Sequence, residues 1–137
     1  MDDVVILSAV RTPIGVIGII SEFGPQVTTD SVALSLKSGN VCLFRGAPEW
    51  IQTNTKLAAI LREAAEGAGI PAGAITFVER PEKEAAIELL RQTVYLDAVI
   101  PRGGAGLRKT VMEQTRLPIL CHDGGLSYVY IDADADL

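Results

Sequence analysis

The segment Pro101-Arg102-Gly103-Gly104-Ala105-Gly106 could bind an anion, because it follows an apolar run and precedes a segment with helical period. Glycines let the backbone approach a ligand closely, and the first turn of a helix offers unpaired N–H groups and partial positive charge. Arg102 adds a charge that pairs well with phosphate. The segment therefore indicates a phosphate or pyrophosphate cradle, with a simple chain-reversing turn as the alternative. It is neither a Walker loop nor the Gly-x-Gly-x-x-Gly fingerprint.

A second basic residue, Arg45, ends another apolar run. At the carboxyl end of a strand it could hold a ribose or a phosphate, and an ordinary surface arginine is the equal alternative. The loop 21–26 also follows an apolar run and could line a pocket wall, although a plain proline-containing loop is the simpler interpretation.

The single histidine, His122, lies between Cys121 and Asp123. Adjacent residues of a strand point to opposite faces, so Cys121 and His122 are not expected to form a thiolate–imidazole pair. A metal centre needs more ligands than this segment offers. We therefore predict no catalytic and no metal-binding residue here, and we expect Cys42 and Cys121 to be buried thiols in strands.

Alternating strands and helices must position these candidates. Short apolar runs predict strands at Val4–Leu7, Val16–Ile20, Val41–Phe44, Ile75–Val78, Ala98–Ile100, Pro118–Cys121 and Tyr128–Ile131. Several runs are apolar at every position, as in strands of a parallel sheet that are covered on both faces. Segments with helical period lie at Asp30–Ser38, Ile51–Ala68, Glu82–Gln92 and Gly106–Thr115.

This alternation predicts an α/β fold, a three-layer Rossmann-like domain with a mainly parallel sheet and helices on both faces. No repeat or long linker divides the 137 residues, so we expect one domain in which residues 1–15 form a leading strand and turn. In such sheets ligands bind beyond the carboxyl ends of the strands, where the candidate residues lie.

The composition narrows the class of protein. Lys and Arg number 12 and Asp and Glu 17, and the net charge of −5 argues against a uniformly basic nucleic-acid binder. No apolar run approaches the roughly 18 residues that span a bilayer, so no membrane partner is expected. Two cysteines are too few for a disulfide scaffold, and Met-Asp-Asp does not begin a secretory signal, so we expect a cytoplasmic protein.

Taken together, the motifs resemble the γ-glutamyl phosphate reductase family of the aldehyde dehydrogenase superfamily. The similar blocks are Val16-Ile-Gly-Ile-Ile20, Leu36-Lys-Ser-Gly-Asn40, Arg45-Gly46, Ile100-Pro-Arg-Gly-Gly-Ala-Gly-Leu107 and Val129-Tyr-Ile-Asp132. The resemblance implies an oxidoreductase of proline biosynthesis that reduces γ-glutamyl phosphate to glutamate-5-semialdehyde with NADPH. It implies that residues 1–137 are a single dinucleotide-binding-type domain that lacks the family's catalytic domain. It places near NADP(H) the residues Glu22, Phe23, Arg45, Gly46, Arg102, Gly103, Gly104 and Gly106.

The sequence also departs from the family. One loop of the family usually reads Glu-Ser-Arg-Pro-Asn-Val-Thr. In this chain Gly24 stands in place of the arginine of that loop, and Gln26 stands in place of its asparagine. Cys121 stands in place of a glutamate found later in the family sequence. The family's nucleophilic cysteine is expected beyond Leu137, so the chain is not expected to be catalytic alone. With few phosphate contacts and no second domain to close over the cofactor, binding is expected to be weak.

Other hypotheses remain open. The chain could be a non-catalytic module, as a pseudoenzyme fragment, a designed protein or an interaction domain that keeps only the fold. It could complete its site with a partner chain that carries the missing catalytic domain, or form a homo-oligomer through exposed apolar surface. The segment Asp3–Gly15 additionally resembles the opening strand and turn of thiolases.

Overall fold

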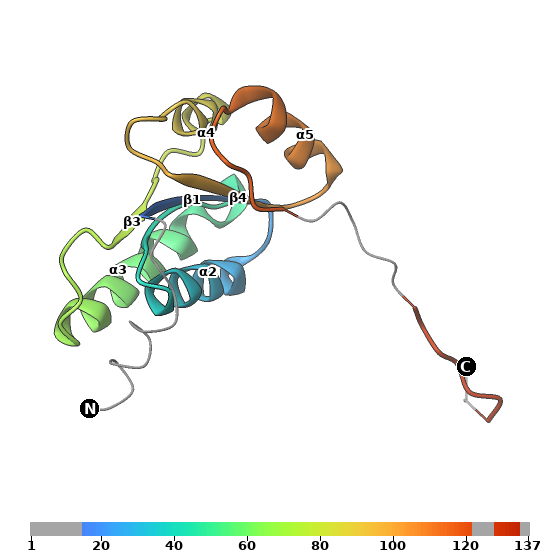
Figure 1. Cartoon of the computed structure of the whole chain (residues 1–137). Coiled ribbons are helices and arrows are strands. Elements are labelled where there is room, and N and C mark those ends of the chain that lie inside the picture. The colour runs from blue at the N-terminus through green and yellow to red at the C-terminus, as the bar shows by residue number, and fades with distance from the viewer. Residues whose placement is uncertain (1–14, 122–127, 135–137) are drawn as a thin grey trace.

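The computed structural model describes residues 15–121 and 128–134 and shows a sheet covered by helices on both faces (Figure 1). The strands are β1 (Val16–Ser21), β2 (Val41–Arg45), β3 (Ile75–Phe77) and β4 (Ala98–Arg102). Their order in the sheet is β3-β2-β1-β4, and all neighbouring pairs are parallel. The predicted three-layer α/β fold is therefore confirmed.

The helices fall into two pairs, one on each side of the sheet. They are α2 (Pro25–Lys37), α3 (Ile51–Gly67), α4 (Lys83–Leu90) and α5 (Ala105–Gln114), with a 3-10 turn, η1 (Pro48–Trp50), before α3. The pair α2 and α3 covers one face, and the pair α4 and α5 covers the other (Figure 1).

Strand β1 lies between β2 and β4 and feeds side chains into both cores. Ile17 and Ile19 belong to the core under α2 and α3, whereas Ile20 belongs to the core under α4 and α5. Because alternate residues of a strand point to opposite faces, a central strand with two covered faces is apolar throughout. This explains the unbroken run Val16-Ile-Gly-Ile-Ile20.

The start of α2 differs from the prediction, which placed it at Asp30 rather than Pro25. Pro25 occupies the first turn, where a missing N–H costs nothing. The buried side of this helix carries Thr28, Ser31 and Ser35. Only Thr28 of these lies in the part that was not predicted, residues 25–29, where a proline and a buried polar side chain give no apolar periodicity.

Two of the predicted strands were wrong. Pro118–Cys121 makes only a single parallel bridge, between Val99 and Ile119, and Cys121 is exposed rather than buried. Tyr128–Ile131 is not a strand, and its side chains are exposed. The remaining predicted strand, Val4–Leu7, and His122 lie outside the described residues.

The core under α2 and α3 supports a stability prediction. Phe44 is 1% exposed, and its ring stacks on that of Phe77 with centroids 6.0 Å apart. Phe44→Ala removes this contact and leaves a cavity, and we expect it to lower the free energy of unfolding by about 3–5 kcal/mol. Urea denaturation followed by circular dichroism measures the loss. Val94→Ala, at a side chain that is 86% exposed, is the control, and equal stability of the two variants would contradict the described packing.

Candidate functional site

A cavity of about 430 Å³ lies beyond the carboxyl ends of β1 and β2, bounded by α4 and α5. Three of the predicted site residues, Glu22, Arg45 and Gly106, line it. The remaining lining residues are Ile20, Ala47, Pro48, Glu49, Pro81, Lys83, Ala86, Ile87, Leu90, Leu107 and Thr110. The cavity therefore combines an apolar wall from the helices with charged groups from the strand ends.

Arg45, the last residue of β2, is only 7% exposed. Its Nη2 atom donates to the carbonyl oxygen of Pro81 at 2.7 Å. Among the described residues, its buried Nε atom has no hydrogen-bond partner. Burial lowers the pKa of the guanidinium from its ordinary value, and the charges of Glu49 and Glu82 act in the opposite direction. An unpartnered donor of a buried cation is costly, so an acceptor that reached this N–H would stabilise the site.

The glycine turn before α5 is occupied by the carboxylate of Glu22. Glu22 directly follows β1, and its Oε2 atom accepts a hydrogen bond from the backbone N–H of Gly104 at 3.0 Å. A Cβ atom added to Gly103 would collide with the same oxygen and would lie 2.7 Å from Cδ2 of Leu107. Within the described chain, no side chain caps the first turn of α5 itself. Gly103 and Gly104 thus meet an internal anion at the place where the sequence predicts a ligand phosphate.

Two other predicted residues, Phe23 and Gly46, lie outside the cavity. Phe23 is 47% exposed, and its backbone N–H donates to Oγ of Ser21 at 3.0 Å. Gly46 faces α3, where an added Cβ would collide with Nδ2 of Asn54. Neither residue is among those that line the cavity.

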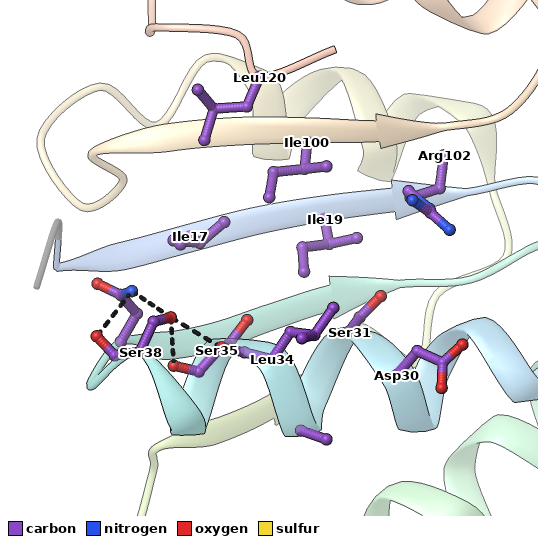
Figure 2. Close-up of a pocket in the computed structure, with 12 residues that line it drawn as sticks. Ile17, Ile19, Asp30, Ser31, Leu34, Ser35, Ser38, Ile100, Arg102 and Leu120 are labelled. Carbon is purple, nitrogen blue, oxygen red and sulfur yellow. Dashed lines mark hydrogen bonds between the residues drawn. The ribbon is translucent and has the colours of Figure 1, made fainter. Parts of the chain in front are cut away.

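Arg102 lies apart from Arg45, in a second cavity of about 580 Å³ on the α2 side of the sheet. Figure 2 shows Arg102 at the end of a surface formed by Ile17, Ile19 and Ile100, with α2 along one side and Leu120 on the other. The structure therefore does not bring the two arginines together, although both are the last residues of strands that end at the same edge of the sheet.

Sequence reasoning missed one cation of the first cavity, Lys83, the first residue of α4. Its position after β3, at the edge where ligands bind, was the available indication. With Lys83 included, the lining holds two basic residues, Arg45 and Lys83, and two acidic ones, Glu22 and Glu49. In the part of the chain that the structure describes, no cluster of His, Cys, Asp and Glu could hold a metal ion, and no helix is long and apolar enough to cross a membrane.

A parallel α/β sheet with a ligand-sized cavity beyond its strand ends defines the Rossmann-like class of domains. The model of the aldehyde dehydrogenase family matches residues 2–137, so the chain belongs to that family. The matched range includes the segment 3–15.

Its relatives include γ-glutamyl phosphate reductases. The enzyme of that name from Moorella thermoacetica is 47% identical over 131 residues, which cover 96% of this chain and 31% of the relative. The crystal structure of γ-glutamyl phosphate reductase from Thermotoga maritima superposes with a TM-score of 0.77 and 40% identity, over 80% of this chain and 27% of that one. Glyceraldehyde-3-phosphate dehydrogenase GapN from Methanocaldococcus jannaschii, complexed with NADP, shares the fold at 18% identity, with a TM-score of 0.71 over 80% of this chain and 24% of that one. The chain spans about 30% of the length of the curated relatives it matches.

Cys42 provides a pH-dependent prediction. Its side chain is fully buried, and burial raises the pKa of the thiol to about 11 from an ordinary 9.0, against a smaller opposing effect of the Ser35 hydrogen bond. The unfolded chain therefore releases this proton at lower pH than the folded chain does. The contribution of the protonated Cys42 thiol to the free energy of unfolding is fully present below pH 9.0 and is lost as the pH rises toward 11.

We expect the wild type to lose on the order of 2 kcal/mol more unfolding free energy than Cys42→Ala between about pH 8 and about pH 10.5. Urea denaturation at the two pH values measures the difference. Thiol labelling of the native chain at the lower pH, in which only exposed Cys121 should react, confirms that Cys42 is buried. Parallel pH profiles for the two proteins would refute the assignment.

Proposed function

We propose that the cavity beyond β1 and β2 binds NADP(H), and that the chain is the dinucleotide-binding part of a γ-glutamyl phosphate reductase. The observation that carries this proposal is the guanidinium of Arg45, a residue that lines the cavity, is 7% exposed, and keeps its Nε atom without a partner among the described residues. A buried donor of this kind suits the phosphate or ribose oxygens of a nucleotide.

The cavity also suits the rest of such a ligand. Its volume of about 430 Å³ falls in the range of small-molecule sites. Ile20, Ala86 and Leu90 supply apolar wall for a base, and Lys83 supplies a second positive charge. Apart from its chain neighbours and the backbone of its own helix, no described atom lies within 4 Å of a Cβ placed on Gly106, so α5 is accessible there.

The relatives support the same assignment. Those named γ-glutamyl phosphate reductase suggest that the complete reaction is the reduction of γ-glutamyl phosphate to glutamate-5-semialdehyde, a cytoplasmic step of proline biosynthesis. NADPH supplies the hydride in such a reaction. In this proposal Arg45 and Lys83 bind the cofactor, and the apolar wall orients it and excludes water.

We also propose that residues 1–137 act as a single dinucleotide-binding-type domain and that the nucleophilic cysteine comes from outside this chain. Cys42 is buried in the core, and Cys121 does not line the cavity. The apolar surface in Figure 2 suits contact with a catalytic domain, whether in a longer polypeptide, a partner chain or a second copy.

Calorimetric titration with NADPH tests the site. We expect saturable binding that Arg45→Met weakens at least about tenfold, because a charged hydrogen bond is lost while the apolar stem is retained. Arg116→Met, at an exposed arginine away from the cavity, is the matched control and should leave the dissociation constant unchanged.

Arg102→Met distinguishes the two cavities in the same titration. Because Arg102 lines the other cavity, we expect less than about a twofold effect. A large loss with Arg102→Met and none with Arg45→Met would move the proposed site to the α2 side. Absence of binding by a folded wild-type chain at millimolar NADPH would favour the non-catalytic module instead.

A further inference from the structure

The glycine turn before α5 already holds an anion. We infer that the Glu22 carboxylate is an internal competitor for ligand phosphate: it occupies the Gly104 N–H and must swing away before a phosphate can bind there. This inference rests on the proposed nucleotide site and assigns Glu22 an inhibitory role in it. Glu22 would then oppose anion binding rather than assist it.

The local geometry defines what the competitor occupies. Glu22 Oε2 lies 3.0 Å from the nitrogen of Gly104, and a Cβ on Gly104 would lie 3.9 Å from the same oxygen. The carboxylate therefore lies against both glycines of the turn. Backbone N–H groups at a helix N-terminus bind carboxylates and phosphates by the same interaction, so the two anions compete for one position.

A second observation points to a ligand at this place. Arg45 lines the same cavity as Glu22, is 7% exposed, and keeps its Nε unpartnered within the described chain. The ion pairs of the described residues are Arg80–Glu82 and Lys109–Glu113, so the Glu22 carboxylate does not neutralise Arg45. Arg45 belongs to neither of these ion pairs, although the charges of Glu49 and Glu82 act on it, so its guanidinium can pair with a further anion in the cavity.

Displacement of Glu22 needs little rearrangement. Glu22 is exposed, so its carboxylate can rotate from the turn into water without being buried. A ligand phosphate displaces the Glu22 carboxylate from the Gly104 N–H only if other contacts of the ligand add to its binding free energy. Binding by the adenosine part of a dinucleotide to the apolar wall provides such contacts, whereas a free phosphate or pyrophosphate makes no contact with that wall. Glu22 thereby weakens every phosphate ligand by a similar factor, and a dinucleotide offsets this loss through its remaining contacts.

The test compares dissociation constants for NADPH and for inorganic pyrophosphate, at fixed ionic strength, in the full chain. We expect Glu22→Ala to tighten binding of both probes about fivefold. Glu22→Gln keeps an acceptor for Gly104 N–H but loses the charge, so it should tighten binding by a smaller factor. Glu66→Gln, which removes an exposed charge from the far end of α3, is the matched control and should change neither constant.

Thermal unfolding separates this role from a merely structural one. Loss of the Gly104 contact should lower the melting temperature of Glu22→Ala, but a structural defect alone would not tighten binding. Unchanged or weaker pyrophosphate binding in both variants, or no pyrophosphate binding by any protein, would overturn the inference.

The proposed function can fail separately. If neither the wild type nor any variant binds NADPH, while pyrophosphate binds more tightly to Glu22→Ala, the cofactor assignment is wrong and the competition stands. If the wild type binds NADPH through Arg45 and both Glu22 variants bind as the wild type does, the cofactor site stands and the competition is refuted.

Discussion

The parallel pairing of β1 with both β2 and β4 is the constraint on which the rest of the structure depends. Parallel strands leave the sheet at one edge, and the register sets Ile20 beside Arg45 and Ser21 beside Arg102. The residues that follow these strands therefore meet although they are distant in sequence. The contact between Glu22 and Gly104 spans 82 residues and exists only because β1 and β4 end at the same level. The burial of β1 on both faces keeps this register, because a slip by one residue would exchange its two apolar faces.

The same register decides which charged groups can act together. Paired residues of neighbouring strands share a face, so Arg45 lies on the side of Ile20, toward α4 and α5. Arg102 pairs with Ser21, the next residue along, and lies on the opposite side with Ile19. A difference of one position in register thus separates two arginines that both end strands. The cavity toward α4 and α5 takes its second cation from Lys83 of α4 instead.

Sequence patterns were sufficient for the layers of the fold but not for contacts that depend on register. The apolar run of β1 and the helical period of α3 were clear because their burial is carried by apolar side chains. The first turn of α2, residues 25–29, was not predicted because it begins with a proline and its buried face carries the polar side chain of Thr28. Pro118–Cys121 has a strand-like composition, yet pairing needs a partner along its whole length, and only the bridge from Ile119 to Val99 forms. The separation of Arg102 from Arg45 could not be predicted from the two sequence segments, because it depends on how β2 and β4 pair with β1.

The glycine motif shows why spacing alone gives an incomplete account of a phosphate site. A side chain at Gly103 would have to displace the ends of the Glu22 and Leu107 side chains, whereas Gly106 borders open space in the described structure. The two glycines of the motif therefore differ in their surroundings: Gly103 packs against other side chains, and Gly106 is open to solvent. A turn that can hold a phosphate can equally hold a carboxylate from its own chain, since both accept from the same N–H groups. An anion site at the end of a parallel sheet can therefore be assigned only after the partners of its N–H donors are known. Here the Gly104 N–H is bound by the carboxylate of Glu22, an exposed side chain that can rotate into solvent.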